Sequence, residues 1–382
     1  MHVPNLFDSF FLGGFECSTH RRHDGRRLDL IAATGHDRHA ASDYARMTGH
    51  GIRTVRDGVR WHLIETAPGR YDWSSLLPMV RAARTAGVQV IWDLCHYGWP
   101  DDIDIWRPAF VERFARFAGA VAALMRDEGI EAPFYCPVNE ISYWSWAGGD
   151  KARFNPMAQG RGFELKHQLV RATIAAIDAI RAVAPDARIV HVDPVINVLP
   201  RPDRPNDRKA AEHFRLAQFE AWDMIAGHIW PGLGGRPDCL DIIGVNYYSD
   251  NQWFLNGGTI ERTHPLYRPF ADILAETFQR YGRPILVAET GAEGDARAPW
   301  FDYVAEQVQS ALQRGVPVEG VCLYPILDYP GWTNERHCEV GLYGLCDEQG
   351  ERPLHQPLAD ALKRHGARRD ALPARTPELA AW

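Results

Sequence analysis

The sequence lacks the features that would place this protein in a membrane or outside the cell. No run of about 18 apolar residues is present, which excludes a bilayer-spanning helix. The opening segment, MHVPNLFDSFFLGGFECS, has no basic region, long apolar stretch or small-residue cleavage site of a secretory signal. The 7 cysteines are an odd number, and several lie in apolar runs, which favours buried thiols over disulfides. We therefore expect a cytoplasmic protein without a membrane partner.

Strong charge and the common cofactor motifs are also missing. The formal net charge is −7, which gives no support for nucleic-acid or membrane-surface binding. No close-spaced cysteine pair is present, which argues against a cysteine-based zinc site. No glycine-rich phosphate loop follows the first apolar run, which argues against an open dinucleotide-binding sheet. We expect no cofactor, no metal and no nucleic-acid partner.

What the chain does contain is a regular alternation of apolar, β-branched runs with amphipathic, Ala- and Arg-rich stretches of helical spacing. Many helical stretches close with glycine before the next run, as helix ends commonly do. In 382 residues, 46% of them hydrophobic, this pattern predicts an α/β fold, a single (β/α)8 TIM barrel, with an open doubly wound sheet as the alternative. We expect residues 1–366 to form the catalytic barrel and residues 367–382 to be a flexible tail. The predicted strands are Phe10–Phe15, Ile52–Val55, Val88–Leu94, Phe134–Val138, Arg188–Val192, Leu240–Val245, Pro284–Ala288 and Glu319–Tyr324.

Polar side chains gather at the carboxyl ends of these apolar runs. In a barrel of this kind those ends face the active site, so the side chains are expected to lie together. A single polar residue at a strand end is usually a capping or loop residue, whereas the whole collection is hard to explain by packing alone. The polar strand-end residues are Glu16, Arg56, Asp57, His96, Asn139, Glu140, Asp193, Asn246, Tyr248, Glu289 and Tyr324.

Glu140 and Glu289 are the expected catalytic pair. They end the fourth and seventh predicted strands, which we expect to lie on opposite sides of the barrel mouth. Two facing carboxylates perform glycoside hydrolysis when one stays ionised and the other holds a proton. Arg56 and the Tyr248 hydroxyl would keep Glu289 ionised, whereas Tyr247 would point away because successive strand residues alternate. The negative charge of Glu289 would then help Glu140 to keep its proton.

With these residues in place, the chain resembles the glycoside hydrolases of clan A, and most of all family 1, the β-glucosidase and β-galactosidase group. The resemblance covers residues 10 to about 350 and rests on motifs in the family's order. It implies that Glu140 is the acid/base and Glu289 the nucleophile. The matching segments are RDGVRW with Arg56 and Trp61, HYGWP from His96, PVNEI with Glu140, GVNYY from Gly244, AETG with Glu289, and YPILDYPGW from Tyr324 to Trp332.

The resemblance also assigns substrate-binding roles. His96 and Asn139 would bond the hydroxyls of the sugar, and Tyr324 and Trp332 would form a stacking wall for the sugar ring. Two family groups are absent. Gly331 replaces a glutamate that grips the sugar, and the glutamine after strand one is missing, where Glu16, His20 or Arg21 stand instead. Loss of both should change the preferred sugar.

The basic, histidine-rich segment 20–39 allows three interpretations. Its two His-x-x-His pairs raise the possibility of a metal site, although no glutamate or cysteine accompanies them. A solvated basic loop is the simplest interpretation. The third is a loop at the rim of the active site that contacts an acidic sugar or a phosphate through arginines.

The sequence therefore predicts a retaining O-glycosyl hydrolase that cleaves a β-linked glycoside by double displacement, with a small saccharide or glycoside as its partner. The remaining substrate-binding candidates are Glu16, Arg56, Asn246 and Tyr248, of which Arg56 and Tyr248 would also keep Glu289 ionised. A transglycosidase on the same scaffold, a non-catalytic saccharide-binding barrel and a metal-dependent hydrolase remain alternatives. The sequence leaves the sugar, the aglycone and the oligomeric state open.

Overall fold

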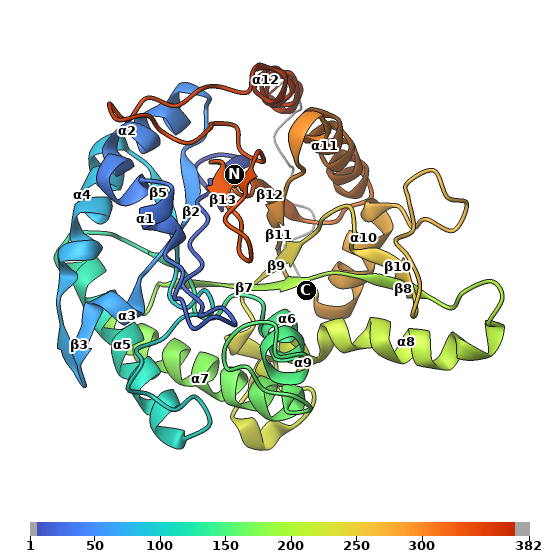
Figure 1. The fold of residues 1–382 in the computed structure, drawn as a ribbon, viewed down its shortest axis with the longest axis horizontal. Helices are drawn as coiled ribbons and strands as arrows, with labels where there is room; N and C mark the ends of the chain where they lie inside the picture. The colour runs from blue at the N-terminus through green and yellow to red at the C-terminus, as the bar shows by residue number, and fades with distance from the viewer. Residues whose placement is uncertain (1–5, 371–382) are drawn as a thin grey trace.

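The protein is a closed barrel of eight parallel strands surrounded by helices (Figure 1). The computed structural model describes residues 6–370. Strand β1 pairs with β2 on one side and with β12 on the other, which closes the sheet. The predicted TIM barrel is therefore confirmed, and the open doubly wound sheet is excluded. In barrel order the strands are β1 (Phe11–Gly14), β12 (Val318–Leu323), β11 (Ile285–Thr290), β9 (Ile242–Asn246), β7 (Arg188–Pro194), β6 (Phe134–Cys136), β5 (Gln89–Asp93) and β2 (Thr54–Gly58).

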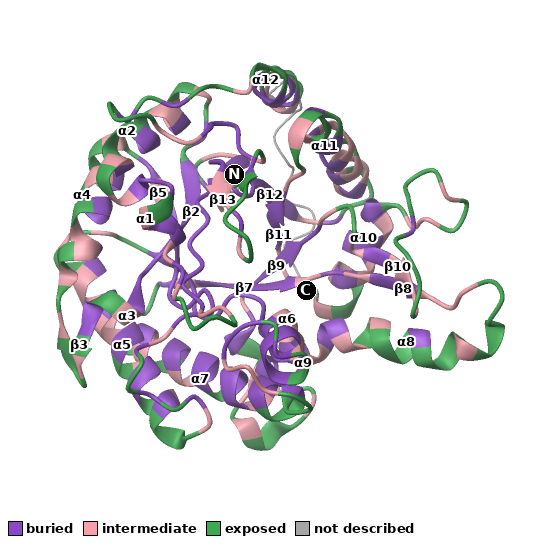
Figure 2. Ribbon diagram, in the orientation of Figure 1, coloured by how far each residue is buried: buried purple, intermediate pink, exposed green. Residues whose placement is uncertain are grey.

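Apolar side chains on both faces of these strands explain why the sheet is buried throughout. Strands of an all-parallel sheet are covered on both faces and therefore contain nearly continuous apolar runs. Figure 2 shows the strands in the colour of buried residues, whereas the helices alternate between buried and exposed. The barrel interior is filled by a separate cluster of side chains that includes Leu12, Ile91, Phe134, Val190, Val192 and Leu286.

The helices form the outer layer and turn their apolar faces inward. In α5, the residues Phe110, Phe114, Phe117 and Val121 recur at helical spacing and are completely buried. Helix α4 ends at Gly87 with φ of 64°, a left-handed conformation that favours glycine. The α-helices are α1 (Leu30–Ala33), α2 (His36–Gly49), α3 (Trp61–Ile64), α4 (Leu77–Ala86), α5 (Pro108–Asp127), α6 (Ile141–Trp144), α7 (Gly162–Val183), α8 (Arg208–Leu216), α9 (Glu220–Ile225), α10 (Phe270–Tyr281), α11 (Arg297–Gln313) and α12 (Gln356–Asp370).

Short helices and strands outside the barrel connect its main elements. Helix α8 and the two-stranded sheet of β8 and β10 extend away from the barrel on the right of Figure 1. A π-helical turn over Ser145–Asp150 follows α6 directly. The accessory strands are β3 (Glu65–Ala67), β4 (Arg70–Tyr71), β8 (Asn197–Leu199), β10 (Gln252–Phe254), β13 (Tyr329–Pro330) and β14 (His337–Cys338).

Several predicted boundaries differ from the structure. Strands β2 and β11 extend past their predicted ends, so Arg56 and Glu289 lie within strands. Helix α12 passes the predicted domain boundary at residue 366 and continues to Asp370. The rest of the predicted tail, 371–382, lies outside the described residues. All 7 cysteines are free. Among the described residues, no helix has the length and apolarity needed to cross a membrane.

Candidate active site

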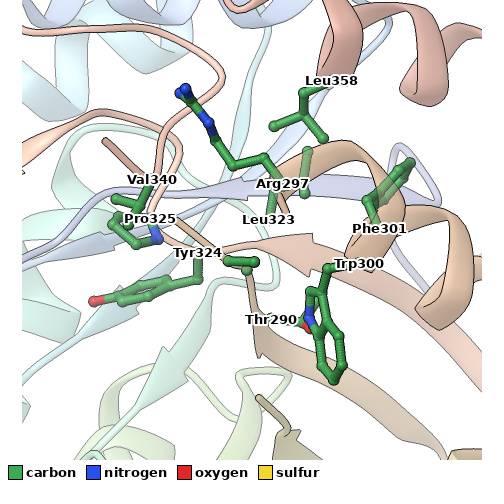
Figure 3. Close-up of a pocket in the computed structure, with 11 residues that line it drawn as sticks. Thr290, Arg297, Trp300, Phe301, Leu323, Tyr324, Pro325, Val340 and Leu358 are labelled. Carbon is green, nitrogen blue, oxygen red and sulfur yellow. The ribbon is translucent and has the colours of Figure 1, made fainter. Parts of the chain in front are cut away.

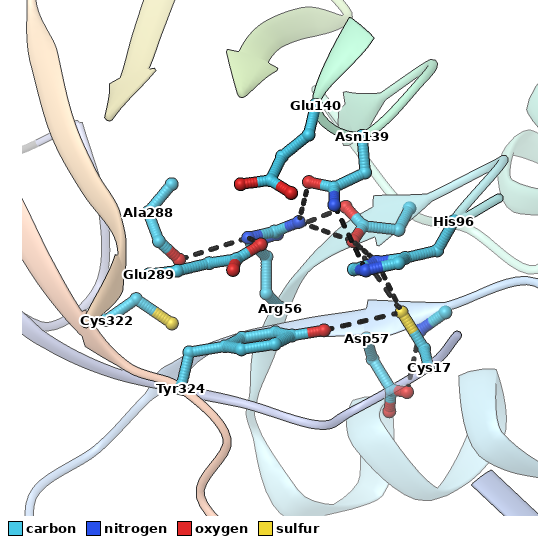
Figure 4. A network of polar contacts seen from close by, with 12 residues as sticks. Cys17, Arg56, Asp57, His96, Asn139, Glu140, Ala288, Glu289, Cys322 and Tyr324 are labelled. Atoms are coloured by element: carbon cyan, nitrogen blue, oxygen red, sulfur yellow. Dashed lines mark hydrogen bonds and ion pairs between the residues drawn. The ribbon is translucent and has the colours of Figure 1, made fainter. Parts of the chain in front are cut away.

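The two candidate catalytic carboxylates converge at the carboxyl-end face of the barrel (Figure 4). Glu289 comes from β11 and Glu140 from the turn after β6, with β9 and β7 between these strands along the shorter arc of the barrel. Both side chains are buried, with 5% of Glu289 and 9% of Glu140 exposed. Each is bonded to a different set of partners, and this difference defines the chemistry of the site.

Glu289 lies at an irregularity in its strand. The registers of β11 with β9 and with β12 both shift after Val287, and such shifts re-aim the side chains that follow. Arg56 Nη1 donates to Oε1 of Glu289 at 2.8 Å, and the Tyr248 hydroxyl donates to Oε2 at 3.0 Å. Burial raises the pKa of Glu289 to about 6, although the Arg56 cation lowers it. The carboxylate is therefore ionised above this pH.

Arg56 is fully buried and holds several groups at once. It forms an ion pair with Asp93 at 2.6 Å, in addition to its contact with Glu289. Its Nη2 also donates to Asn139 Oδ1 at 2.8 Å. The Tyr324 ring supports the guanidinium, whose central carbon lies 5.1 Å from the ring centroid. Only glycine fits at position 14, because a Cβ there would lie 2.1 Å from Cδ2 of Tyr324.

Glu140 is held by the backbone of neighbouring strands in a left-handed conformation with φ of 47°. Its amide donates to the Val192 carbonyl at 2.9 Å, and this bond fixes the turn against β7. Asn246 Nδ2 donates to Oε1 at 2.8 Å, and the Tyr97 hydroxyl donates to Oε2. Burial raises the pKa of Glu140, although these two donors lower it. Within residues 6–370, Glu140 has no ion pair with a Lys, Arg or His side chain.

His96 and Asn139 are bonded to each other beside the carboxylates. Asp93 lies 3.1 Å from Nδ1 of His96, so this nitrogen carries the proton and donates. Nε2 of His96 then accepts from Asn139 Nδ2 at 3.0 Å. Both side chains are buried in the position predicted for sugar-binding groups, and the same Asn139 amide also contacts Arg56 and Tyr97.

The predicted stacking wall is divided between two different environments. Tyr324 is only 3% exposed and lies under Arg56, so one of its ring faces is already covered. Trp332 is partly exposed and contacts the rings of His20 and Tyr97 at centroid distances of 4.7 and 5.7 Å. Trp332 is therefore the better candidate for contact with a sugar ring.

The three residues considered in place of the missing glutamine take different positions. Burial raises the pKa of Glu16, although the nearby His96 lowers it. Oε1 of Glu16 accepts from the Ser18 amide at 3.0 Å, and within the described chain its other oxygen has no hydrogen-bond partner. His20 packs against Trp332, whereas Arg21 turns away to Asp101. Glu16 is the one with an acceptor available to a ligand.

Two residues of the network were not singled out from the sequence. Asp93 ends β5 and pairs with Arg56, but the apolar run QVIWDL made it look like the interior of a strand. Tyr97 bonds directly to Glu140. It follows His96 in a turn with φ of 67°, and a tyrosine in this conformation could not be predicted from the sequence. Asp193 is one of the predicted strand-end residues. It accepts from the Ser142 amide, and burial raises its pKa to about 7.

The arginines of the loop 20–39 are bonded to acidic residues of the protein itself. Arg21 and Arg27 both pair with Asp101, and Arg22 and Arg26 both pair with Glu335. These pairs attach the loop to the segments after β5 and β12, at the rim of the barrel mouth. Because these four arginines already form ion pairs within the protein, the interpretation that they bind an acidic substrate is weakened.

The histidines of this loop do not come together as a metal site. His20 packs among aromatic rings, whereas His36 begins α2 and is bonded to Asp43 at 2.8 Å and Asp57 at 2.9 Å. Within residues 6–370, one group of possible ligand atoms does lie together, and it comprises Cys17, Asp93 and His96. Asp93 already neutralises the Arg56 cation there, and burial raises the pKa of the Cys17 thiol, so this group fits a metal ion poorly.

One cavity borders the network, and another is lined by the chain that follows Glu140. A small one, of about 10 Å³, lies behind Tyr324 and is lined by Thr290, Trp300, Leu323 and Leu358 (Figure 3). It has no room for a sugar. A larger cavity of about 670 Å³ borders the chain that follows Glu140. Its wall includes the aromatic side chains of Tyr143, Trp146, Phe163, Phe214 and Trp253.

Comparison with known proteins supports the fold described above. No family model matches the chain. The β-galactosidase of Sulfolobus acidocaldarius is 28% identical over 313 residues, which is 68% of this chain and 62% of that protein. This chain therefore spans less than two thirds of the length of that relative.

Solved structures match almost the whole chain. The β-glucosidase of Thermotoga maritima in complex with glucoimidazole superposes with a TM-score of 0.77 and 17% identity, over 96% of this chain and 99% of that one. The AHE enzyme from Alicyclobacillus herbarius gives a TM-score of 0.77 with 18% identity over the same shares. The fold is thus that of the family 1 β-glucosidases. The predicted resemblance to clan A, and within it to family 1, is confirmed.

Proposed function

We propose that this protein hydrolyses β-linked glycosides with retention of configuration, with Glu289 as nucleophile and Glu140 as general acid/base. The observation that carries the proposal is the unequal pairing of the two carboxylates. Glu289 is bonded to the Arg56 cation, whereas Glu140 is bonded only to the neutral donors Tyr97 and Asn246. A cation favours the ionised form of its partner, and burial without a cation favours the protonated form.

In the first step, an oxygen of ionised Glu289 attacks the anomeric carbon of the sugar. Glu140 gives its proton to the glycosidic oxygen as the bond to the leaving group breaks, and the leaving group departs as an alcohol. Arg56 and Tyr248 keep Glu289 aimed and ionised until the attack. A glycosyl-enzyme ester and an ionised Glu140 result.

In the second step, Glu140 acts as a base. It takes a proton from a water molecule, and the water oxygen attacks the anomeric carbon while the bond to Glu289 breaks. Glu140 is then protonated and Glu289 is again ionised, so the cycle is complete without a cofactor. Retention by this route requires a separation of about 5–5.5 Å between the two carboxyl groups.

The surrounding residues suggest how a small saccharide is held. Glu16 has a carboxylate oxygen without a partner among the described residues, and Trp332 presents a partly exposed ring. His96 and Asn139 are bonded to each other and to Asp93, Arg56 and Tyr97, so they orient the groups around the carboxylates. The aromatic-lined cavity includes Ser142 and Tyr143, which follow Glu140 closely in the chain. We assign this cavity to the leaving group.

The test is a panel of aryl glycosides that includes β-glucoside, galactoside, fucoside, xyloside and glucuronide with α-linked controls. We expect the wild type to release nitrophenol from at least one β-glycoside. Glu289→Gln should lose activity by at least about 10³-fold, and so should Glu140→Gln on substrates with poor leaving groups. Proton NMR of the first sugar released should show the β-anomer.

A covalent trap separates this proposal from its competitors. A 2-deoxy-2-fluoro β-glycoside with a good leaving group should add one glycosyl mass to the peptide that contains Glu289. Release of the α-anomer first would contradict retention. Transfer of the sugar to an added alcohol instead of water would identify a transglycosidase. Binding of oligosaccharides without any turnover would identify a non-catalytic saccharide-binding barrel.

A further inference from the structure

Tyr97 occupies a position that the backbone adopts only under constraint. It is 1% exposed and has φ of 67°, a left-handed conformation that is rare for a bulky residue. Asn155 Nδ2 donates to its carbonyl at 2.9 Å and thereby fixes the turn. The rings of Trp144 and Phe154 pack against its ring at centroid distances of 5.6 and 5.2 Å. Such constraints concentrate at sites where a side chain has to be aimed.

The direction of the Tyr97 hydroxyl is determined by its neighbours. Arg56 has only donors, so the oxygen of the Asn139 side-chain amide faces it. The two amide hydrogens of Asn139 consequently point to His96 and, at 3.0 Å, to the Tyr97 oxygen. Because that oxygen accepts from Asn139, the single hydroxyl hydrogen of Tyr97 is free for Glu140 Oε2.

These bonds form an unbroken chain between the two carboxylates. Arg56 donates to Glu289 and to Asn139, then Asn139 donates to Tyr97, and Tyr97 donates to Glu140. In the series that runs from Arg56 through Asn139 and Tyr97 to Glu140, each hydrogen bond is donated in the direction away from the cation. Hydrogen bonds aligned in this way polarise one another. The hydroxyl of Tyr97 is therefore a stronger donor than an isolated phenol, and it contacts the carboxylate that has to gain and lose a proton.

We propose that Tyr97 is a positioning residue that orients Glu140 and stabilises its ionised form. The role rests on the proposed function: in the second step Glu140 is ionised, and the Tyr97 bond is strongest in that state. Tyr97 keeps its own proton throughout, since burial beside Glu140 raises its pKa well above the ordinary value. No proton leaves Tyr97, so the step remains the transfer from water to Glu140 described above.

The experiment is a direct titration of Glu140 by NMR, with glutamate labelled by carbon-13 at the side-chain carboxyl. The Glu140 resonance is assigned by its absence in Glu140→Gln. In Tyr97→Phe the donor is lost while the ring remains, so the pKa of Glu140 should rise by about 1 to 2 units. The pH profile of kcat/KM should show the same rise in its basic limb.

Tyr135→Phe is the matched control. Tyr135 lies on β6, the strand that leads to Glu140, is completely buried, and has a hydroxyl without a hydrogen-bond partner in the described part of the chain. Its removal should leave the Glu140 titration unchanged. Thermal unfolding of both variants identifies any general loss of structure.

The outcomes distinguish this inference from the proposed function. An unchanged titration of Glu140 in folded Tyr97→Phe would overturn the role of Tyr97, whatever the activity of the enzyme. A raised pKa in a protein that cleaves no glycoside would support the Tyr97–Glu140 bond and refute the glycosidase proposal. An equal rise in Tyr135→Phe would show that the effect is not specific, and it too would overturn the inference.

Discussion

The Arg56 guanidinium lies 2.8 Å from Oε1 of Glu289, and both side chains are buried. The same guanidinium neutralises Asp93 and orients Asn139. One cation thus fixes the charge state of the proposed nucleophile and the geometry of the groups around it.

Arg56→Lys should lower kcat/KM by about 10²- to 10³-fold, because an ammonium cannot reproduce the planar fork that contacts Glu289, Asp93 and Asn139 together. Steady-state kinetics on the best β-glycoside measures the loss. Arg188→Lys is the control, since Arg188 forms a similar two-bond pair with Asp241 at the opposite end of the barrel, with both distances at 2.8 Å. A change within twofold in Arg56→Lys would contradict the role of Arg56.

The fall of kcat/KM at acidic pH should follow the protonation of Glu289. Because burial raises the pKa of this carboxyl to about 6, kcat/KM should fall as the pH drops below that value and the nucleophile becomes protonated. Tyr248→Phe removes a donor to the ionised form and should move this fall in kcat/KM to higher pH. Tyr247→Phe should leave it in place, since Tyr247 turns outward onto Phe270 and bonds to Tyr267. Identical acid limbs in wild type and Tyr248→Phe would refute the assignment.

Unfolding stability should depend on pH through His36. Burial lowers the pKa of this imidazole, but Asp57 and Asp43 outweigh it and raise the pKa to about 9. The folded pKa is above the unfolded value, so the stabilisation is complete below about pH 6.5 and disappears as the pH rises through about 9. We expect about 3 kcal/mol of unfolding free energy to be lost over that interval.

Urea unfolding at several pH values tests this effect. His36→Gln cannot take a charge and should be less stable than the wild type at pH 6, with a much flatter dependence between pH 6.5 and 9. If both proteins lose stability in parallel, the effect belongs to another group.

The aromatic-lined cavity, which we assign to the leaving group, should determine which leaving groups are accepted. Trp146 lines it and is covered on one side by Arg153, whose guanidinium carbon lies 4.3 Å from the ring centroid. Trp146→Ala should raise KM about 5- to 10-fold for aryl or disaccharide substrates. The KM for a methyl glycoside should stay unchanged. Trp73→Ala, in a turn before α4, is the control. An equal increase for all substrates would place the leaving group elsewhere.

The positions of the two carboxylates could be predicted because the barrel follows a simple rule. The apolar runs identified the strands, and in a barrel every strand ends at the same face, so Glu140 and Glu289 had to lie at one mouth. The alternation of side chains along β9 likewise separated Tyr248, which bonds to Glu289, from Tyr247, which packs outward. These inferences require only the periodicity of the chain.

What could not be predicted depends on local backbone geometry. Tyr97 reaches Glu140 through a left-handed turn, and the bulge at Glu289 shifts the register of β11 against both neighbours. Gly98 follows Tyr97 and Gly291 lies two residues after Glu289, but a nearby glycine predicts neither that the tyrosine itself is left-handed nor where the register shifts. The pairing of the loop arginines with Asp101 and Glu335 was equally hidden, since their acidic partners lie far away in the sequence.

The pairing that closes the barrel has a consequence for synthesis of the protein. Strand β1 completes its ladder only with β12, where Leu12 lies opposite Cys322. At about 5–20 residues per second, a ribosome needs on the order of 15–60 s to deliver the second strand after the first. During that interval β1 is an open edge made of apolar residues, which invites pairing with other nascent chains. The protein is therefore expected to depend on chaperones that shield β1 until β12 has been synthesised.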